Sequence, residues 1–283
     1  MNSRIEKLIE NSGDTTFRDY RPYQKIKVVN TIEASHTEAE KANMEGVVTN
    51  ILDKYTLKEY FCAKGGMQKD IDKITKAINK SGISFEGKRI LEFGAGTCKL
   101  SATISSLFDV EEIWVLDQTE NLLREIAPRI ISALGGDINK FTFAIGDMNT
   151  AFKIKEKFDA VVCFGAVHHL YLPEYFFEKI DEVLNPNGII LIVDEPTLPR
   201  FNSIPFTQAK NFKKHHFAKK RIGENENAYT IKRYKEIFGD KWNTKLITVS
   251  PLKTRLYQWL SINYFMTNYL LKLKTKGKES YNR

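Results

Sequence analysis

The stretch Ile90-Leu91-Glu92-Phe93-Gly94-Ala95-Gly96-Thr97-Cys98-Lys99-Leu100 decides the fold that we expect for this chain. Apolar residues lead into two glycines one residue apart, and a helix-compatible run follows. That order is typical of a buried strand, a tight turn and a helix start. Glycine at 94 and 96 lets the backbone turn without a Cβ and approach a ligand closely. Thr97 is the expected helix cap, and the free N–H groups of the helix would face the same ligand.

Strands and helices alternate after this turn. The apolar pattern predicts strands over residues 89–93, 112–116, 141–145, 158–164 and 188–194, and helices over 98–107, 119–133 and 174–184. Continuous apolar runs such as residues 160–164 suit a parallel sheet covered by helices on both faces. The segment Asn185-Pro186-Asn187-Gly188 is an expected turn. The sequence therefore predicts an α/β fold with a doubly wound, mostly parallel sheet.

Composition bounds the class of protein. The chain has 283 residues, of which 42% are hydrophobic and 28% charged, with a net charge of +8. These values are ordinary for a soluble globular protein, and the positive charge favours anionic partners. Three cysteines, no signal peptide and no uncharged run of about 20 apolar residues favour a cytoplasmic location.

The spacing around the glycines separates three kinds of nucleotide site. A dinucleotide fingerprint needs a small residue where Lys99 stands, and a Walker A loop needs a Gly-Lys-Ser/Thr run that is missing here. The pattern Glu92-x-Gly94-x-Gly96-x-Cys98 instead resembles the first motif of class I S-adenosylmethionine (SAM) methyltransferases, usually acid-x-Gly-x-Gly-x-Gly. Cys98 replaces the third glycine of that motif. Cysteine is small and still allows the chain to enter the helix.

Three later stations add to the resemblance, which covers roughly residues 65–195. The second strand ends in Asp117, about 20 residues after the turn, where a carboxylate accepts the ribose hydroxyls. The third strand ends in Asp147-Met148. In the family, an acid at this position accepts a hydrogen bond from the adenine amino group, and the next residue packs on the adenine ring. The fourth ends in Phe164-Gly165, before the His168-His169 pair. The resemblance implies SAM as cofactor, S-adenosylhomocysteine as product, and cofactor contacts from Glu92, Gly94, Ala95, Gly96, Asp117, Gln118, Asp147, Met148, Phe164 and Gly165.

Methyl transfer is an in-line displacement, so a base is needed only when the acceptor must lose a proton. His168 and His169 are candidate bases of equal standing, because histidine titrates near working pH. Either one could instead line the pocket or cap the next helix. Glu195, at the end of the fifth strand, is expected either to orient the acceptor or to pair with a lysine. A metal site is not expected, since the aspartate that catechol-type enzymes place after the fourth strand is missing.

The resemblance divides the chain into four parts. Residues 1–66 form an N-terminal helical extension or cap, which includes helix 38–57 and a glycine-hinged aromatic segment over 60–68. Residues 67–196, which begin with helix 67–78, form the SAM-binding, Rossmann-like core. Residues 197–240 form an acceptor-binding insertion that ends with helix 229–238. Residues 241–283 complete the sheet with a strand over 246–249 and add an amphipathic tail.

Two segments bear on partners. Residues 210–221 carry a cationic cluster that would suit a phosphorylated or carboxylated acceptor, or would simply form a solvated surface helix. The run 256–271 is uncharged and aromatic. It would cover the core, form a homodimer contact or lie peripherally in a membrane interface.

The sequence thus favours an enzyme that methylates O or N of a small or medium-sized acceptor, with an anionic sugar or a lipid-linked molecule among the candidates. The Asn/Asp-Pro-Pro-Tyr/Phe motif of amino-group nucleic-acid methyltransferases is missing after the fourth strand, where residues 164–167 read Phe-Gly-Ala-Val. Two alternatives remain: an RNA methyltransferase that uses residues 210–221, and a SAM-binding protein without turnover.

Overall fold

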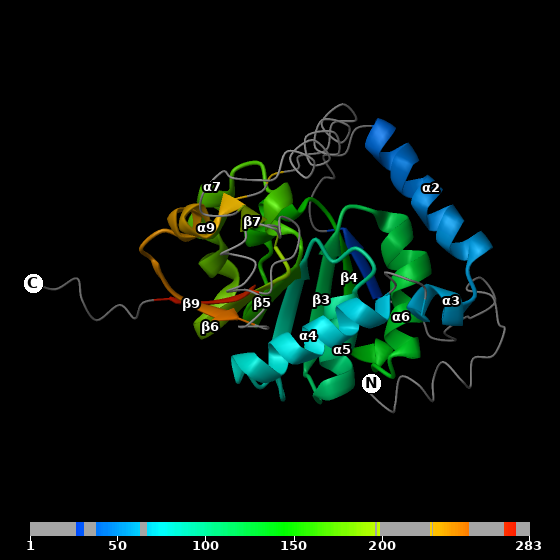
Figure 1. The fold of residues 1–283 in the computed structure, drawn as a ribbon, viewed down its shortest axis with the longest axis horizontal. Helices are drawn as coiled ribbons and strands as arrows, with labels where there is room; N and C mark the ends of the chain where they lie inside the picture. The colour runs from blue at the N-terminus through cyan, green and yellow to red at the C-terminus, as the bar shows by residue number, and fades with distance from the viewer. Residues whose placement is uncertain are drawn as a thin grey trace, which may run out of the picture. The chain divides into compact units, whose positions relative to one another are not determined.

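The computed structural model describes residues 27–30, 38–62, 67–195, 197–198, 227, 229–248 and 269–275. The cationic cluster at 210–221 and residues 256–268 of the aromatic run lie outside these ranges. The chain divides into two compact units, Met1–Met148 and Asn149–Arg283. In each unit helices flank the strands, as Figure 1 shows.

The first unit contains four parallel strands. Their order is β1 (Lys27–Asn30), β4 (Phe141–Ile145), β3 (Glu112–Asp117) and β2 (Arg89–Phe93). The register pairs Phe93 with Leu116 and Asp117 with Ile145, so β2, β3 and β4 end at one edge of the sheet. We call it the first carboxyl edge. The strand β1 was not expected, because four residues are too few to show an alternating pattern.

The described part of the first unit has five α-helices: α2 (Glu38–Lys54), α3 (Leu57–Cys62), α4 (Met67–Ser81), α5 (Lys99–Leu107) and α6 (Ala127–Ala133). The predicted apolar face of α4 is confirmed, since Ile71, Ile74 and Ile78 are buried. The helix expected over 38–57 ends at Lys54, and the short helix α3 follows it.

The helix expected over residues 119–133 is present from residue 120 onward, with a π-helical turn inside it. A π-helical turn, η1 (Leu122–Ile126), precedes α6, and Pro128 stands in the first turn of α6. Proline has no N–H to donate to the preceding turn, and its ring clashes with the carbonyl four residues earlier. The backbone therefore widens locally before α6 begins.

In the described part of the second unit, four strands lie side by side in the order β5 (Phe158–Phe164), β6 (Leu184–Val193), β10 (Tyr269–Thr275) and β9 (Trp242–Thr248). The pair β5–β6 is parallel, and β10 runs antiparallel to both of its neighbours. The helix α7 (Pro173–Lys179) connects β5 to β6 and packs on α9 (Ile231–Phe238), with Phe177 and Phe238 ring centroids 4.7 Å apart. A short second sheet pairs β7 (Thr197–Leu198) with β8 (Tyr229–Thr230).

Several predicted boundaries in this unit are wrong. The expected helix 174–184 ends at Lys179 and continues as a 3-10 turn, and the expected helix 229–238 begins only at Ile231. The expected turn at 185–188 lies inside β6 as a bulge. There the pairing shifts from Phe158 with Leu184 to Ala160 with Ile189. Asn187 adopts the left-handed backbone typical of turns, with a φ of 66°, but the strand continues through it. The strand expected over 246–249 already begins at Trp242, whose side chain is buried.

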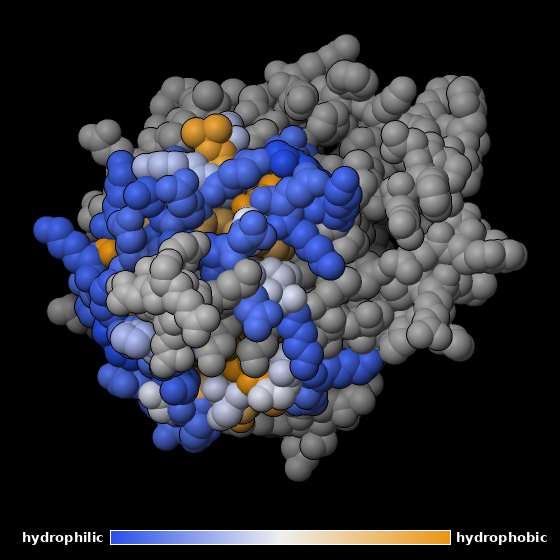
Figure 2. Space-filling view, turned by 90° about the vertical axis from the view of Figure 1, so that its left-hand side faces the viewer, coloured by the Kyte–Doolittle hydropathy of each residue, from blue (hydrophilic) through white to orange (hydrophobic). Residues whose placement is uncertain are grey.

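The outer surface around α7 and α9 is mostly hydrophilic, with small apolar spots between charged side chains (Figure 2). Among the described residues, three large hydrophobic side chains are exposed, and they follow one another closely: Tyr171, Leu172 and Tyr175. None of the described helices combines the length and the apolar composition that crossing a membrane requires.

Candidate active site

The glycine turn lies at the first carboxyl edge, between β2 and α5. Gly94 and Gly96 have φ values of 61° and 51°, a backbone conformation that residues with a side chain rarely adopt. The turn is held on β3, because Ala95 N–H donates to the Leu116 carbonyl at 3.1 Å. A Cβ at Gly96 would meet no atom within 4 Å, so the backbone there borders open space. This is the cradle that a closely approaching ligand needs.

The predicted cap at Thr97 is wrong. The capping residue of α5 is Cys98, whose side chain makes no capping bond and whose φ is 60°. Cys98 thus adopts the left-handed backbone of the glycine that it replaces in the methyltransferase motif. The Thr97 side chain instead hydrogen-bonds Tyr60 of α3.

Asp117 and Gln118 follow β3 at the same edge. One carboxylate oxygen of Asp117 accepts from Gly96 N–H and the other from Thr119 N–H, each at 2.8 Å. Asp117 is only half-buried, and each oxygen retains a second lone pair for a further donor. The Gln118 side-chain oxygen is buried and makes no hydrogen bond within the described part of the chain. Both side chains are acceptors suited to hydroxyl or amino donors of a ligand.

Asp147 and Met148 follow β4. Both are buried, with 7% and 9% of their surface exposed. Gly146 N–H donates to the Asp117 carbonyl at 3.1 Å, which ties the end of β4 to the end of β3. An acid, a thioether and the glycine turn therefore share one edge of one sheet.

Glu92 lies one residue before the turn and is 1% exposed. It accepts a hydrogen bond of 3.1 Å from Ser101 N–H of α5. Burial raises its pKa to about 7, although the hydrogen bonds of Ser101 act in the opposite direction. Glu92 therefore exchanges its proton close to neutral pH.

Two polar side chains precede the glycine turn in sequence, Tyr60 of α3 and Gln68 of α4. Burial raises the pKa of Tyr60 to about 12, against the opposing effect of its hydrogen bond to Thr97. Gln68 of α4 bonds Asp72, and its side-chain oxygen is buried without a hydrogen-bond partner among the described residues. The aromatic segment over 60–68 thus begins in a helix that contacts the glycine turn. No local pattern identifies Tyr60, because the contact spans 37 residues of sequence.

In the second unit, Glu195 organises the turn that follows β5. Phe164 pairs with Val193, so Gly165–His169 and Asp194–Glu195 leave the sheet at the same edge. One oxygen of Glu195 accepts from Ala166 N–H at 2.8 Å and from Val167 N–H at 2.9 Å. Its second oxygen accepts from His168 N–H at 3.2 Å and lies 2.9 Å from His168 Nδ1. The ion-pair partner of Glu195 is therefore His168, where the sequence suggested a lysine.

The ionised state of Glu195 fixes the tautomer of His168. Burial opposes the charge on Glu195, but the hydrogen bonds and charge of His168 and the N–H groups of the turn lower its pKa below the usual value. A carboxylate can only accept, so Nδ1 of His168 carries the proton and Nε2 is the basic nitrogen of the neutral ring. His169 is half-buried, and its ring centroid lies 3.9 Å from that of His168.

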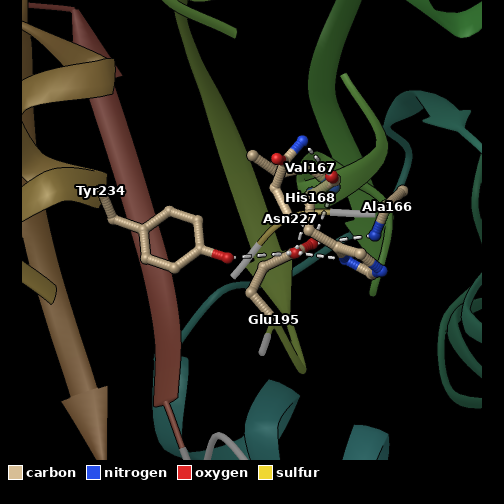
Figure 3. Close-up of polar contacts among 6 residues, drawn as sticks. All are labelled: Ala166, Val167, His168, Glu195, Asn227 and Tyr234. Carbon is tan, nitrogen blue, oxygen red and sulfur yellow. Dashed lines mark hydrogen bonds and ion pairs between the residues drawn. The ribbon is translucent and has the colours of Figure 1, made fainter. Parts of the chain in front are cut away.

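Two further residues complete this network, and Figure 3 shows Glu195 between Tyr234 and the turn. The Tyr234 hydroxyl of α9 donates to Glu195 at 3.5 Å. Asn227 donates to the His168 carbonyl from both its backbone N–H and its side-chain amide, at 3.2 Å each. The sequence analysis missed both residues, since no motif marks them.

A comparison with protein families identifies the core. Residues 91–190 match the family described as a methyltransferase domain. This stretch is a class I, SAM-dependent methyltransferase domain. No curated protein matches the chain in sequence.

Solved structures agree on the fold of the methyltransferase domain. A Haloferax volcanii protein, solved in complex with the Trm112 methyltransferase activator, is similar with a TM-score of 0.53 and 14% identity, over 86% of this chain and 99% of that one. Phosphoethanolamine N-methyltransferase 2 of Haemonchus contortus is similar with a TM-score of 0.51 and 15% identity. The match covers 93% of this chain and 61% of that one. The YcgJ protein of Bacillus subtilis is similar with a TM-score of 0.51 and 15% identity. The match covers 73% of this chain and 99% of that one. The predicted Rossmann-like fold with its mostly parallel sheet is confirmed.

The cofactor of this methyltransferase domain is SAM, and the residues at the first carboxyl edge fit it. An open glycine turn, a half-buried carboxylate at Asp117 and an unpaired acceptor at Gln118 match a ligand with ribose hydroxyls. The first unit brings together eight of the predicted site residues: Glu92, Gly94, Ala95, Gly96, Asp117, Gln118, Asp147 and Met148. The second unit groups the other five: Phe164, Gly165, His168, His169 and Glu195.

Proposed function

We propose that the methyltransferase domain transfers a methyl group to an oxygen or nitrogen that must first lose a proton, on a small or medium-sized acceptor. His168 is the base, and the reaction is a direct in-line displacement without a metal that leaves S-adenosylhomocysteine. The observation that carries this proposal is the buried pair of His168 and Glu195, with Nδ1 2.9 Å from the carboxylate. A carboxylate bonded to Nδ1 orients the ring and stabilises its charged form when Nε2 takes a proton.

The cofactor supplies an electrophilic methyl group on a positively charged sulfur. Asp117 would accept the ribose hydroxyls and Asp147 the adenine amino group, with Met148 against the ring. The backbone of residues 94–96 would border the rest of the ligand. Glu92 would complement the positive charge, which favours its ionised form. These roles follow the family resemblance, and the edge that these residues share supports them.

The acceptor that we propose carries negative charge. Residues 149–283 contain 23 lysines and arginines against 13 aspartates and glutamates, whereas residues 1–148 contain 20 against 22. The excess positive charge is thus confined to the second half of the chain, where it would attract an anion. One structure with the same fold holds the phosphorylated amine phosphomonomethylethanolamine, which supports this class of acceptor. The reaction would take place in the cytoplasm, because three cysteines are an odd number and do not suggest a disulfide framework.

Calorimetric titration of the full chain with SAM and S-adenosylhomocysteine tests the cofactor site. We expect micromolar binding that Asp117→Ala weakens at least tenfold, because the ribose loses a charged hydrogen-bond partner worth about 1.5–3 kcal/mol. Glu111→Ala is the matched control, since this exposed acid lies at the opposite end of β3. Folded protein that binds neither ligand would overturn the proposal.

A screen with methyl-labelled SAM then tests the acceptor. Hydroxyl and amino compounds with and without a phosphate or carboxylate group are compared at low and moderate salt. We expect transfer to anionic members, with a mild dependence on salt. A steep loss of binding to RNA between the two salt concentrations, together with label in RNA alone, would contradict a small acceptor and favour nucleic acid.

A further inference from the structure

We infer that Tyr234 of α9 is a positioning residue that acts on His168 through Glu195. The inference rests on the proposed role of His168 as a base. It adds a residue from outside the family motifs and assigns α9 a part in the methyl-transfer site.

The hydroxyl of Tyr234 competes with His168 for one oxygen atom. It donates to Glu195 Oε2 at 3.5 Å, the oxygen that also accepts from His168 N–H at 3.2 Å and lies 2.9 Å from Nδ1. Three donors on one carboxylate oxygen divide its negative charge among them. The strength of the bond to Nδ1 therefore depends on whether the tyrosine hydroxyl is present.

The position of Tyr234 is fixed by its surroundings. Its side chain is fully buried, and its ring contacts Tyr229 at an edge and stacks with Phe238, with centroids 5.3 and 6.1 Å away. A ring packed in this way cannot turn its hydroxyl elsewhere without disturbing α9. Figure 3 shows the hydroxyl directed at the Glu195 carboxylate.

Tyr234 remains protonated, and therefore a donor, at neutral pH. Its burial, and then the charge of Glu195, raise the pKa of the phenol well above its usual value. The other titratable groups that face this network are His169 beside His168, Tyr229 and Cys163 near Tyr234, and Glu174 and Arg233 near Tyr229. The hydroxyl itself does not titrate, so it sets the geometry of the pair without exchanging a proton.

The backbone holds the same arrangement from two sides of the sequence. Asn227 donates twice to the His168 carbonyl, and Asp194 adopts a left-handed φ of 60° immediately before Glu195. Non-glycine residues rarely take that conformation unless the surrounding structure enforces it. The constraint at Asp194 and the bonds of Asn227 thus fix the two ends of the bond between Glu195 and His168.

Nitrogen-15 NMR of histidine-labelled full-length protein tests the inference without an acceptor. The chain has five histidines, and His168→Ala assigns the signal. We expect a downfield Nδ1–H proton for His168 in the wild type. In Tyr234→Phe it moves further downfield, because Glu195 then shares its charge with one donor fewer. Tyr229→Phe is the matched control and leaves the signal in place, since no hydrogen bond joins that hydroxyl to Glu195 in the structure.

An unchanged Nδ1–H signal in a folded Tyr234→Phe protein would overturn the inference. If that variant does not fold, fluorinated tyrosine at position 234 keeps the ring and makes its hydroxyl a stronger donor to Glu195, so the signal should move upfield, and an unchanged signal would again overturn the inference. With an acceptor from the screen, Tyr234→Phe should lower kcat roughly tenfold in the wild-type background and not at all in His168→Ala. If the losses in kcat from Tyr234→Phe and His168→Ala were additive, Tyr234 would not act through His168, and the inference would be contradicted. Absence of SAM binding would instead contradict the proposed function, and the NMR result would stand apart from it.

Discussion

Glu92 in the first unit and Glu195 in the second are both buried glutamates, 1% and 3% exposed, yet their pKa values move in opposite directions. Burial raises the pKa of Glu92 to about 7. The pKa of Glu195 falls below its usual value, although burial opposes its charge as well. Each carboxylate lies beside a turn at the end of a parallel strand. Their accessibility therefore does not explain the difference.

The hydrogen-bond donors explain it. Glu92 accepts one backbone N–H, from Ser101, and Asp117 adds negative charge nearby. Glu195 accepts three backbone N–H groups, the imidazole of His168 and the hydroxyl of Tyr234. Donors that bond the charged form offset desolvation when they are numerous. The comparison teaches that the carboxylate of Glu92 is poised to receive a positive charge from a ligand, whereas the carboxylate of Glu195 is already satisfied by hydrogen-bond donors of its own chain.

Replacing His168 with alanine should produce the largest effect, since it removes the imidazole that bonds the Glu195 carboxylate and that we propose as the base. We expect kcat to fall about 10²–10⁴-fold, the usual contribution of a general base, while the Kd of SAM stays the same. His169→Ala is the matched control and should cost less than about tenfold, because the Glu195 carboxylate bonds the ring of His168, against which the His169 ring lies at 40°. Equal losses in turnover and SAM affinity would contradict the assignment of His168.

Replacing Glu195 with alanine should strongly destabilise the second unit. Three buried N–H groups and an imidazole lose their acceptor, which costs about 3–5 kcal/mol, whereas Glu195→Gln should cost about 1–2 kcal/mol. Urea unfolding at several pH values measures both. Because the folded pKa of Glu195 is lowered, its stabilisation is present above pH 4.5 and is lost as the pH falls through that lower value. A gap between wild type and Glu195→Gln that widens on acidification would contradict this account.

Replacing Glu92 with glutamine should stabilise the fold, whereas Glu195→Gln should destabilise it. The folded pKa of Glu92 is raised, so the ionised acid destabilises the fold progressively as pH rises from 4.5 to about 7. Glutamine keeps an acceptor for Ser101 N–H and carries no charge. We expect Glu92→Gln to be more stable than wild type by about 2–3 kcal/mol at pH 8 and equal to it at pH 4.5. Thermal unfolding without SAM measures the difference, and a variant less stable at pH 8 would refute it.

Binding of SAM should reverse that benefit and sharpen the contrast between the two glutamates. A positive ligand beside Glu92 favours its ionised form, so wild type should release a fraction of a proton on binding near pH 7. Calorimetry in two buffers of different ionisation enthalpy detects this proton. Glu92→Gln should release none and bind SAM about tenfold more weakly. Identical proton release in both proteins would show that Glu92 does not sense the ligand.

The sequence was sufficient for the features that depend on neighbouring residues. The glycine turn, the acid at Asp117 and the apolar face of α4 follow from local spacing, and the structure has them where they were expected. The π-helical turn before α6 also has a local signal, Pro128, that the helical pattern concealed. Tyr234 and Asn227 were out of reach. They bond residues 39 and 59 positions away, and only the folding of the second unit brings them there.

The smallest effect concerns Cys98, which stands beside the network of Glu92 as Asp194 stands beside that of Glu195, each with a φ of 60°. A Cβ in the left-handed region costs about 1–2 kcal/mol, so Cys98→Gly should be more stable than Cys98→Ala by about 1 kcal/mol. The comparison removes the sulfur from both variants and isolates the backbone. Ala102 in the same helix is the matched control, because Ala102→Gly should lose about 1 kcal/mol at an ordinary helical position. Equal stability of the two Cys98 variants by urea unfolding would show that the turn relaxes. The strain beside Glu92 would then differ from the strain that fixes Glu195.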